Sequence, residues 1–224
     1  MPKFAKGQKA FRARAGAKYI AFNKPFAVLT QFSPEKLADG TISDKQTLAD
    51  FYLPKQVYPV GRLDFDSEGL LILSDDGRLT TYLFEGRHPR TYLVQVENVP
   101  SPQTLKGLQS GVVIGGYKTQ PCLARLLNGE PDLPERSKPV RFRKNIPTTW
   151  IELTLWEGKN RQVRKMTAAV GHPTLRLFRQ SIGNLSLAQL DLAPGEWKEL
   201  NLEELSLLLS TGCSNERTSR RESQ

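Results

Sequence analysis

The positions of apolar and polar residues along the chain predict a succession of short strands. KYIAFNKP at 18–25 and GLLILSD at 69–75 are apolar runs that end at Pro or Asp, as buried strands often do. TYLVQVEN at 91–98 alternates apolar and polar residues, which predicts a strand with one buried face. Weaker strand signals, several of them interrupted by Gly or Pro, lie at 56–64, 111–127, 140–144, 148–158 and 174–187.

Other segments have the spacing of amphipathic helices. They lie at 78–86, 101–111, 160–173 and 201–210. Ser101 is suited to be an N-cap, with Pro102 at the first helical position. Val163, Met166 and Val170 share one face of the third segment. Strands outnumber helices and do not alternate regularly with them, so the sequence predicts an α+β fold with a mixed, largely antiparallel sheet flanked by helices.

The composition is that of a globular protein. Of the 224 residues, 38% are hydrophobic and 25% charged, and no apolar run approaches the roughly 20 residues that span a bilayer. The termini are polar, and we expect a flexible basic arm at 1–17 and a disordered tail at 211–224, around one ordered region at 18–210. Cys122 and Cys213 have no CxxC spacing, so we expect free thiols in a reducing cytoplasm, with a disulfide between them as the alternative. No membrane association is expected.

Charge is segregated along the chain. The net charge is +9, residues 1–18 carry six bases and no acid, and residues 136–180 carry eleven bases against two acids. Between 35 and 85 the balance reverses, with ten acids against five bases. This pattern favours a nucleic acid as the partner, although the same basic residues could serve only to keep the protein soluble.

Several catalytic machineries are excluded by their missing motifs. The chain has no GxxxxGK[ST] phosphate loop, no HExxH, no GxSxG and no paired CxxC. His88 and His172 are the two histidines, and each precedes a proline. A site with several histidine ligands is therefore impossible, and a helix that ends in GHP is typical of a structural stop.

The first candidate site is the acidic segment 61–70, GRLDFDSEGL. Asp64 follows the end of a hydrophobic strand, and if that strand stays extended, Arg62, Asp64 and Asp66 point to the same face. One alternative is a solvated acidic turn. The other is a metal site of a nuclease or phosphatase with further acids such as Asp75 and Asp76, although the spacing fits no calcium loop.

The second candidate is the basic segment 157–166, EGKNRQVRKM. It leaves a strand through Gly158 and enters a helix, on which Arg161, Arg164 and Lys165 share one face opposite the apolar stripe. Backbone N–H groups and fixed cations at a helix start, with Lys159 beside them, are suited to bind phosphate. The alternatives are a solvated basic face and an RNA-binding module without catalytic activity.

These residues carry a resemblance to a known family. GRLD at 61–64, continued by SEGLLILSDDG, resembles the catalytic motif of pseudouridine synthases of the RsuA kind. NKP at 23–25, the RTYLV strand from Arg90, and GKNRQVRKM at 158–166 are similar to further motifs of that family, as is LxRxxIGxLxL from 177. GRLD alone would be a weak signal, but the ordered set is specific and spans about 190 of the 224 residues. Position 90 carries Arg where the family usually has Lys, which keeps the charge if the group only contacts phosphate.

The resemblance implies a pseudouridine synthase catalytic fold, with two subdomains around a central cleft at 18–210. Only 60 residues precede Gly61, so the S4-type RNA-binding domain of many members is not expected. The chain then resembles the single-domain members of the RluE type, which act on 23S ribosomal RNA. Pseudouridylation moves a uracil from N1 to C5 attachment without gain or loss of atoms, so neither cofactor nor metal is implied. We expect a monomer.

The resemblance also implies roles for individual residues. Asp64 is the catalytic carboxylate, as nucleophile or base, and Arg164 forms an ion pair with it. Tyr92 stacks on the uracil, and Arg62 fills the gap left by the flipped nucleotide. The remaining candidates bind flanking phosphates: Lys159, Arg161, the N-terminal arm and the basic run at 136–144.

Overall fold

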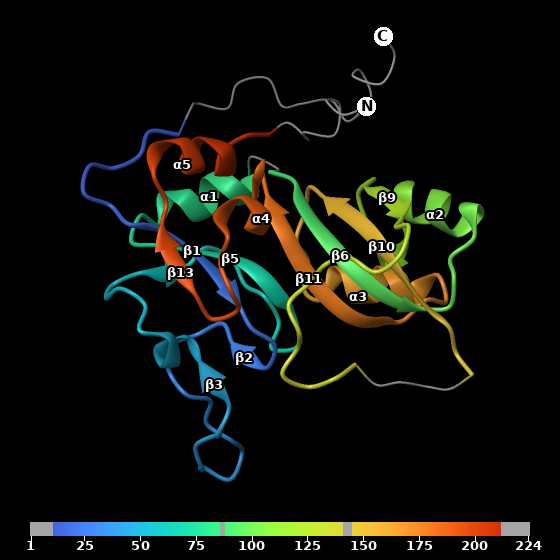
Figure 1. Ribbon diagram of the computed structural model, residues 1–224, viewed down its shortest axis with the longest axis horizontal. Helices are drawn as coiled ribbons and strands as arrows, with labels where there is room; N and C mark the ends of the chain where they lie inside the picture. The colour runs from blue at the N-terminus through green and yellow to red at the C-terminus, as the bar shows by residue number, and fades with distance from the viewer. Residues whose placement is uncertain (1–10, 86–87, 141–144, 212–224) are drawn as a thin grey trace.

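The computed structural model describes residues 11–85, 88–140 and 145–211, and its centre is one nine-stranded sheet (Figure 1). Seven strands follow the order β13-β1-β5-β11-β6-β10-β9, while β4 pairs with β5 and β12 with β11. The strands of this sheet are β1 (Tyr19–Lys24), β4 (Tyr58–Pro59), β5 (Glu68–Ser74), β6 (Arg90–Glu97), β9 (Leu123–Leu126), β10 (Thr148–Leu155), β11 (Thr174–Ile182), β12 (Leu185–Ser186) and β13 (Trp197–Glu199).

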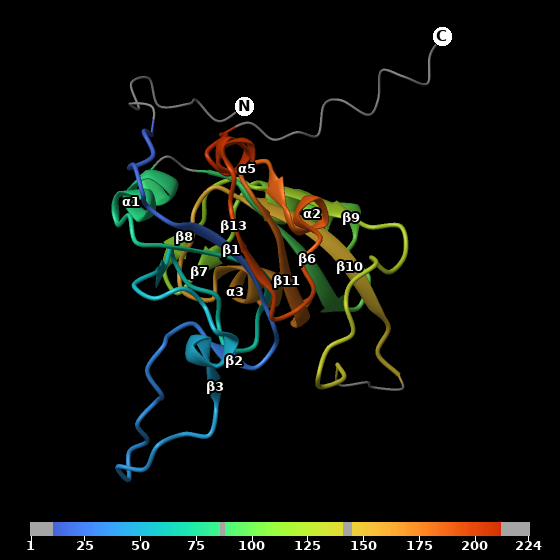
Figure 2. The ribbon, with the colours of Figure 1, turned by 60° about the vertical axis from the view of Figure 1, so that its left-hand side comes forward.

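Two small ribbons accompany the sheet. They consist of β2 (Val28–Leu29) with β3 (Gln46–Thr47), and of β7 (Val113–Ile114) with β8 (Tyr117–Lys118). The segment between β2 and β3 projects from the body of the molecule in both ribbon views (Figures 1 and 2). The helices are η1 (Leu48–Phe51), α1 (Arg78–Glu85), α2 (Pro102–Gln109), α3 (Gln162–Ala169), α4 (Leu187–Leu190) and α5 (Leu202–Leu208).

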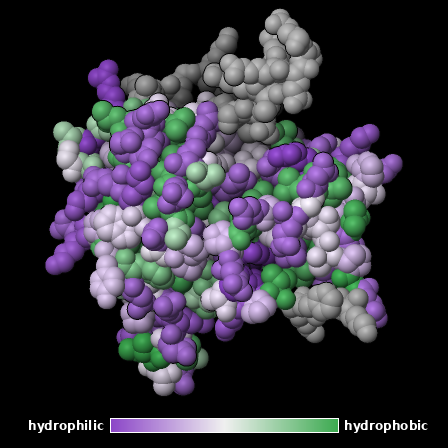
Figure 3. All heavy atoms as spheres, in the orientation of Figure 1, coloured by the Kyte–Doolittle hydropathy of each residue, from purple (hydrophilic) through white to green (hydrophobic). Residues whose placement is uncertain are grey.

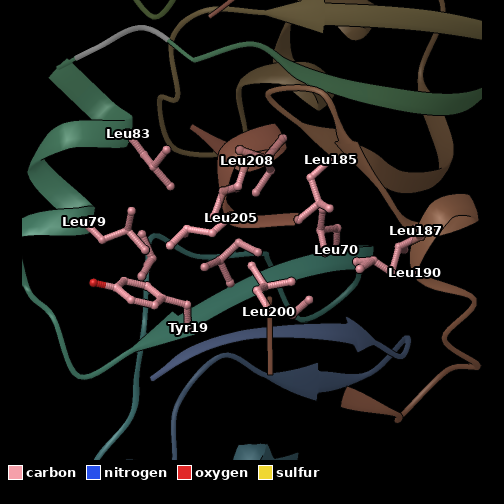
Figure 4. Close-up of a cluster of buried hydrophobic side chains, with 14 of the residues drawn as sticks. Tyr19, Leu70, Leu79, Leu83, Leu185, Leu187, Leu190, Leu200, Leu205 and Leu208 are labelled. Carbon is pink, nitrogen blue, oxygen red and sulfur yellow. The ribbon is translucent and has the colours of Figure 1, made fainter. Parts of the chain in front are cut away.

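Side-chain alternation divides the core between the two faces of the sheet. On one face, Tyr19 and Leu70 pack with leucines of α1, α4 and α5 such as Leu83, Leu190 and Leu208 (Figure 4). The other face carries two separate clusters, because residues of odd and even number point to opposite sides of a strand. One cluster contains Ile20, Phe22, Leu71 and Leu73 with the 48–63 region, and the other contains Val94, Ile151, Val163 and Met166 with α2 and α3.

The β5–β11 pair divides the sheet into two halves. One half contains β13, β1, β4 and β5, and the other contains β11, β12, β6, β10 and β9. All other pairs of the nine described strands are antiparallel, whereas β5 and β11 run parallel and share the register positions Phe178↔Glu68 and Arg179↔Gly69. Gly69 has φ +103°, and a Cβ there would collide with the backbone oxygen of Arg179. Glycine is required at this position because the strands approach so closely.

The structure confirms the α+β class with a mixed, largely antiparallel sheet, and it confirms the predicted helices. Ser101 caps α2 by accepting a hydrogen bond from the Thr104 amide at 3.1 Å. The strand predicted at 56–64 is much shorter, since β4 ends at Pro59 and a turn follows. The predicted strand at 140–144 lies almost wholly outside the described residues, as does the tail at 212–224.

The predicted N-terminal arm is described from residue 11 onwards. Phe11 packs on Tyr82 with ring centroids 5.1 Å apart, and Arg14 forms an ion pair with Asp75 at 3.1 Å. This part of the segment therefore contacts the folded body. Of the two cysteines, Cys122 is a free, buried thiol whose pKa is raised by burial to about 12.

The face seen in Figure 3 is mainly hydrophilic, with apolar residues in small separate groups. Among the described residues no helix has the length and apolar composition to cross a membrane.

Candidate active site

The acidic segment forms a pinned turn between β4 and β5. The Ser67 amide donates to the Asp64 carbonyl at 3.0 Å, and the Thr30 hydroxyl donates to the Leu63 carbonyl at 2.5 Å. The Phe65 carbonyl accepts from the Ala27 amide at 2.9 Å. The strand predicted at 56–64 therefore does not reach Asp64, and the extended backbone that would place Arg62, Asp64 and Asp66 on one face is not present. Three hydrogen bonds to backbone carbonyls hold Asp64 on a turn.

The basic segment supplies the facing side of the site. Arg161 is the N-cap of α3 with φ +50°, in the left-handed region, which is uncommon for a residue with a side chain. The Gln162 side chain holds this turn, because its Nε2 donates to Glu157 Oε1 at 2.6 Å and its Oε1 accepts from the Lys159 backbone amide at 2.9 Å. Val163 anchors the helix in the core beneath.

The cations and carboxylates pair differently from the expectation. Arg161 donates to both carboxylate oxygens of Asp66, at 2.9 and 2.8 Å, and reaches Asp64 Oδ2 at 3.6 Å. Arg164 contacts the Asp66 carbonyl at 2.7 Å and its Oδ2 at 3.3 Å. The predicted Asp64–Arg164 ion pair is thus corrected to Asp64–Arg161. The helix begins one residue after Arg161, so Arg161 lies nearest the turn and Arg164 lies beneath Asp66.

Asp66 is the carboxylate most affected by these contacts. Partial burial acts to raise its pKa, but the hydrogen bond from Arg161 and the charges of Arg164 and Arg161 outweigh burial, so the pKa is lowered. Asp66 is therefore ionised and links the two cations. Asp64 shares only the longer contact, and its side chain is 28% exposed, so its carboxylate is available to a ligand.

A cavity of about 700 Å³ opens beside these residues. Most of the predicted site residues line it: Arg62, Asp64, Tyr92, Lys159 and Arg161. Arg164 does not, and supports the site through Asp66 instead. The volume lies within the usual range for small-ligand sites, so a single nucleotide can be accommodated.

Phe84 of α1 also lines the cavity, although nothing in its sequence pattern marked it as a site residue. Its ring fills the space beside Gly61, where a Cβ would lie 2.5 Å from ring atom Cζ, and it lies close to Gly158. The ring therefore touches both loops that carry the charged groups. No signal beyond the helical pattern of 78–86 could have placed it there, since the contact depends on packing between distant segments.

Arg90 is buried, whereas a simple contact with an RNA phosphate would require an exposed side chain. It is 4% exposed, and its guanidinium stacks on the Phe84 ring at 4.5 Å. Lys24, from the NKP motif, is fully buried behind the turn and donates to the Ser67 carbonyl at 2.8 Å. Burial lowers the pKa of Lys24 to about 7.

The acids near the turn do not gather around one point. Glu68 pairs with Arg176 at 2.9 Å, both side chains being buried, and Asp76 pairs with Arg78 at 2.6 Å. In the part of the chain that the structure describes, no three His, Cys, Asp or Glu residues are grouped so as to hold a metal ion.

Comparison with known proteins gives consistent results. The RNA pseudouridylate synthase family matches residues 18–169. A protein named ribosomal large subunit pseudouridine synthase E from Xanthomonas campestris is 50% identical over 181 residues, covering 80% of this chain and 93% of that protein. A protein of the same name from Vibrio vulnificus is 48% identical over 190 residues, covering 84% and 77%. A crystal structure of a pseudouridylate synthase has a similar fold, with a TM-score of 0.67 at 24% identity over 86% of this chain and 74% of that one.

Proposed function

The chain belongs to the RNA pseudouridylate synthase family, and from that premise we propose that Asp64 is its catalytic carboxylate and a uridine of 23S ribosomal RNA its substrate. The observation that carries the assignment is the position of Asp64 at the cavity, beside Arg161 and on a turn held by three hydrogen bonds to backbone carbonyls. A carboxylate in that place can act on a nucleotide that enters the cavity.

The reaction is an isomerisation of uridine. The bond between C1′ and N1 breaks, the detached uracil turns, and C5 attaches to C1′; the C5 proton is lost and N1 regains one. No cofactor is needed for this balance. Asp64 serves the step at the sugar, as a nucleophile at C1′ or as a base on the ribose, and both roles require the carboxylate to be ionised. Arg161 Nη1 lies 3.6 Å from Asp64 Oδ2, so a positive charge faces the reacting carboxylate.

The other cavity residues bind and orient the RNA. Tyr92 lies on the cavity wall and offers an aromatic face to the uracil. Arg62 is exposed at the rim, where it can occupy the gap left when the uridine leaves its helix. Lys159 and Arg161 lie where the phosphates next to that uridine would pass, with Arg136 and Lys138 of the basic run; Arg141, Arg143 and Lys144 lie outside the described residues.

The choice of 23S ribosomal RNA rests on the names of the relatives compared above, which specify the ribosomal large subunit. Proteins called ribosomal large subunit pseudouridine synthase E are 48–50% identical over most of this chain. We also propose that the protein is a monomer, acts in the cytoplasm, and requires neither a membrane nor a metal ion.

The decisive experiment compares wild type with Asp64→Asn on ribosomal RNA labelled with tritium at C5 of uridine. Wild type should release tritium and form pseudouridine in the presence of EDTA, because no metal takes part. Asp64→Asn should keep the fold and RNA affinity and release no more than a trace. Substantial release by the variant would remove the role of Asp64, and loss of wild-type activity in EDTA would favour a metal-dependent reaction.

The substrate is tested in cells. Pseudouridines in ribosomal RNA are mapped with and without this protein. One 23S position should lose its modification in the absence of the protein, and an unchanged 23S map would refute the choice of substrate.

A further inference from the structure

Two buried arginines in the cavity have no carboxylate partner among the described residues. Arg90 and Arg179 are each 4% exposed and both line the cavity. Arg90 Nη2 contacts the Leu83 carbonyl at 3.4 Å, and Arg179 Nε donates to the Leu70 carbonyl at 2.7 Å. Arg90 Nη1 and Arg179 Nη2 are buried and make no hydrogen bond within the described chain.

Three arginines near these two have carboxylate partners. Arg161 and Arg164 contact Asp66, and Arg176 forms a two-point contact with Glu68 at 3.0 and 2.9 Å. A buried cation without a counter-ion is costly, and a free guanidinium N–H away from water adds to that cost. Two such groups side by side therefore indicate that something in the working enzyme satisfies them.

The two guanidiniums lie on adjacent strands, close enough to repel each other. β6 and β11 are paired, with Arg179 opposite Tyr92 and Ile182 opposite Arg90. Burial lowers the pKa of Arg90, and the positive charge of Arg179 lowers it further. A guanidinium keeps its positive charge in proteins. The result is a concentrated positive charge on the cavity wall, next to the tyrosine proposed to hold the base.

The reaction itself produces an anion at this place. When the C1′–N1 bond breaks with its electron pair left on the base, uracil becomes an anion whose charge spreads over N1, O2 and O4. Resting on the proposed function, we propose that Arg90 and Arg179 stabilise this detached uracil anion and hold it in the cavity until C5 attaches to C1′. Fixed donors and charges aimed at developing negative charge are the strongest common source of catalytic stabilisation.

A backbone phosphate would be the other anion for these arginines. Their burial argues against it, because a phosphate stays attached to the polyanionic strand outside the cavity. Lys159 and Arg161, which are exposed at the same cavity, are better placed for that contact. The Arg90 guanidinium stacks on Phe84, and its buried Nη1 still lacks a hydrogen-bond acceptor within the described chain.

The test measures single-turnover consumption of the target nucleoside, and RNA binding, for wild type, Arg90→Gln and Arg179→Gln. Arg125→Gln is the matched control, since Arg125 is exposed on β9 and pairs with Glu152 away from the cavity. Each cavity variant should lose about 100-fold in rate at saturating RNA, the effect of removing one oxyanion donor. The dissociation constant for RNA should change by less than about threefold, because a contact formed only with the detached base does not contribute to binding.

A second substrate separates anion stabilisation from a structural role. RNA with 5-fluorouridine at the target releases a base whose anion is intrinsically more stable. The loss caused by Arg90→Gln should then shrink to about tenfold, since less stabilisation is required. If Arg90→Gln does not fold, Arg179→Gln gives the same comparison from a different strand.

The outcomes are distinct. Equal losses on uridine and 5-fluorouridine, wild-type rates in both variants, or a loss confined to RNA affinity would each overturn the inference, the last in favour of a phosphate contact. Failure of wild type to form pseudouridine would instead overturn the proposed function.

Discussion

Gly69→Ala should weaken the junction between the two halves of the sheet. Gly69 faces Arg179 across the parallel β5–β11 pair, which has two register positions. Its φ of +103° is unfavourable for any residue with a Cβ, and a Cβ would meet three backbone atoms of Arg179 at 3.0 Å or less. Backbone atoms in a paired strand cannot rotate aside, so the strands must separate.

The magnitude follows from two terms. Holding alanine in this backbone conformation costs roughly 1–3 kcal/mol, and the collision with β11 costs roughly 1–3 kcal/mol more. The free energy of unfolding should therefore fall by about 2–6 kcal/mol, out of a typical 5–15 kcal/mol. For a chain of this size that lowers the melting temperature by roughly 5–20 °C.

The assay is thermal and urea unfolding followed by circular dichroism, with Gly77→Ala as the matched control. Gly77 lies just before α1 with open space around its Cα, so alanine there should change stability by less than about 1 kcal/mol. Pseudouridine formation at 20–25 °C should also fall in Gly69→Ala, because the β5–β11 junction holds Asp64 next to Arg161. Equal midpoints for the two variants would refute this reasoning.

Three other substitutions test the charges behind the site. Glu68→Gln leaves Arg176 buried without its carboxylate and should cost about 3–5 kcal/mol in urea unfolding. Glu152→Gln breaks a pair whose arginine is 60% exposed and should cost at most about 1 kcal/mol. Similar costs for the two variants would contradict the reasoning from burial. In the folded protein the pKa of Lys24 is lowered from 10.5 to about 7, so the unfolded chain binds the lysine proton more tightly. The free energy of unfolding of wild type should therefore increase as pH rises between these two pKa values. Lys24→Met should lack up to about 2 kcal/mol of that gain between pH 7.5 and 9.5, and parallel pH profiles would exclude a buried titrating lysine. Arg161→Gln should lower turnover by at least about tenfold while costing about 1 kcal/mol or less in stability, as its side chain is 41% exposed; unchanged turnover at saturating RNA would remove its role beside the carboxylate.

Local signals in the sequence were sufficient for much of the fold. The helix from Pro102 follows from a Ser cap and a first-turn proline, and the apolar spacing of Val163 and Met166 places α3 against the core. The cavity residues could be proposed because Asp64 and Arg161 lie in motifs that contain their own turn and helix start. Each of these features depends on neighbours within a few residues.

Pairing between distant segments could not be obtained in this way. Spacing alone does not decide whether Asp64 meets Arg161 or Arg164, since one turn of helix separates the two and the choice depends on where α3 begins. The burial of Arg90 depends on Phe84 and on β11, segments that sequence patterns do not align. A charged residue is rarely buried without a partner, so sequence patterns predict an exposed Arg90, whereas the structure has it buried.

The position of the site explains why the two halves carry opposite charges. The carboxylates of Asp64, Asp66 and Glu68 come from the turn and strand of one half, and the cations that face them come from the other half. These contacts cross the junction where the sheet has its short parallel pair. Any opening between the halves would thus separate Asp64 from Arg161 and disrupt the cavity wall at the same time. Because the same contacts join the sheet and place the carboxylate, substitutions that loosen the junction should reduce activity before the protein unfolds.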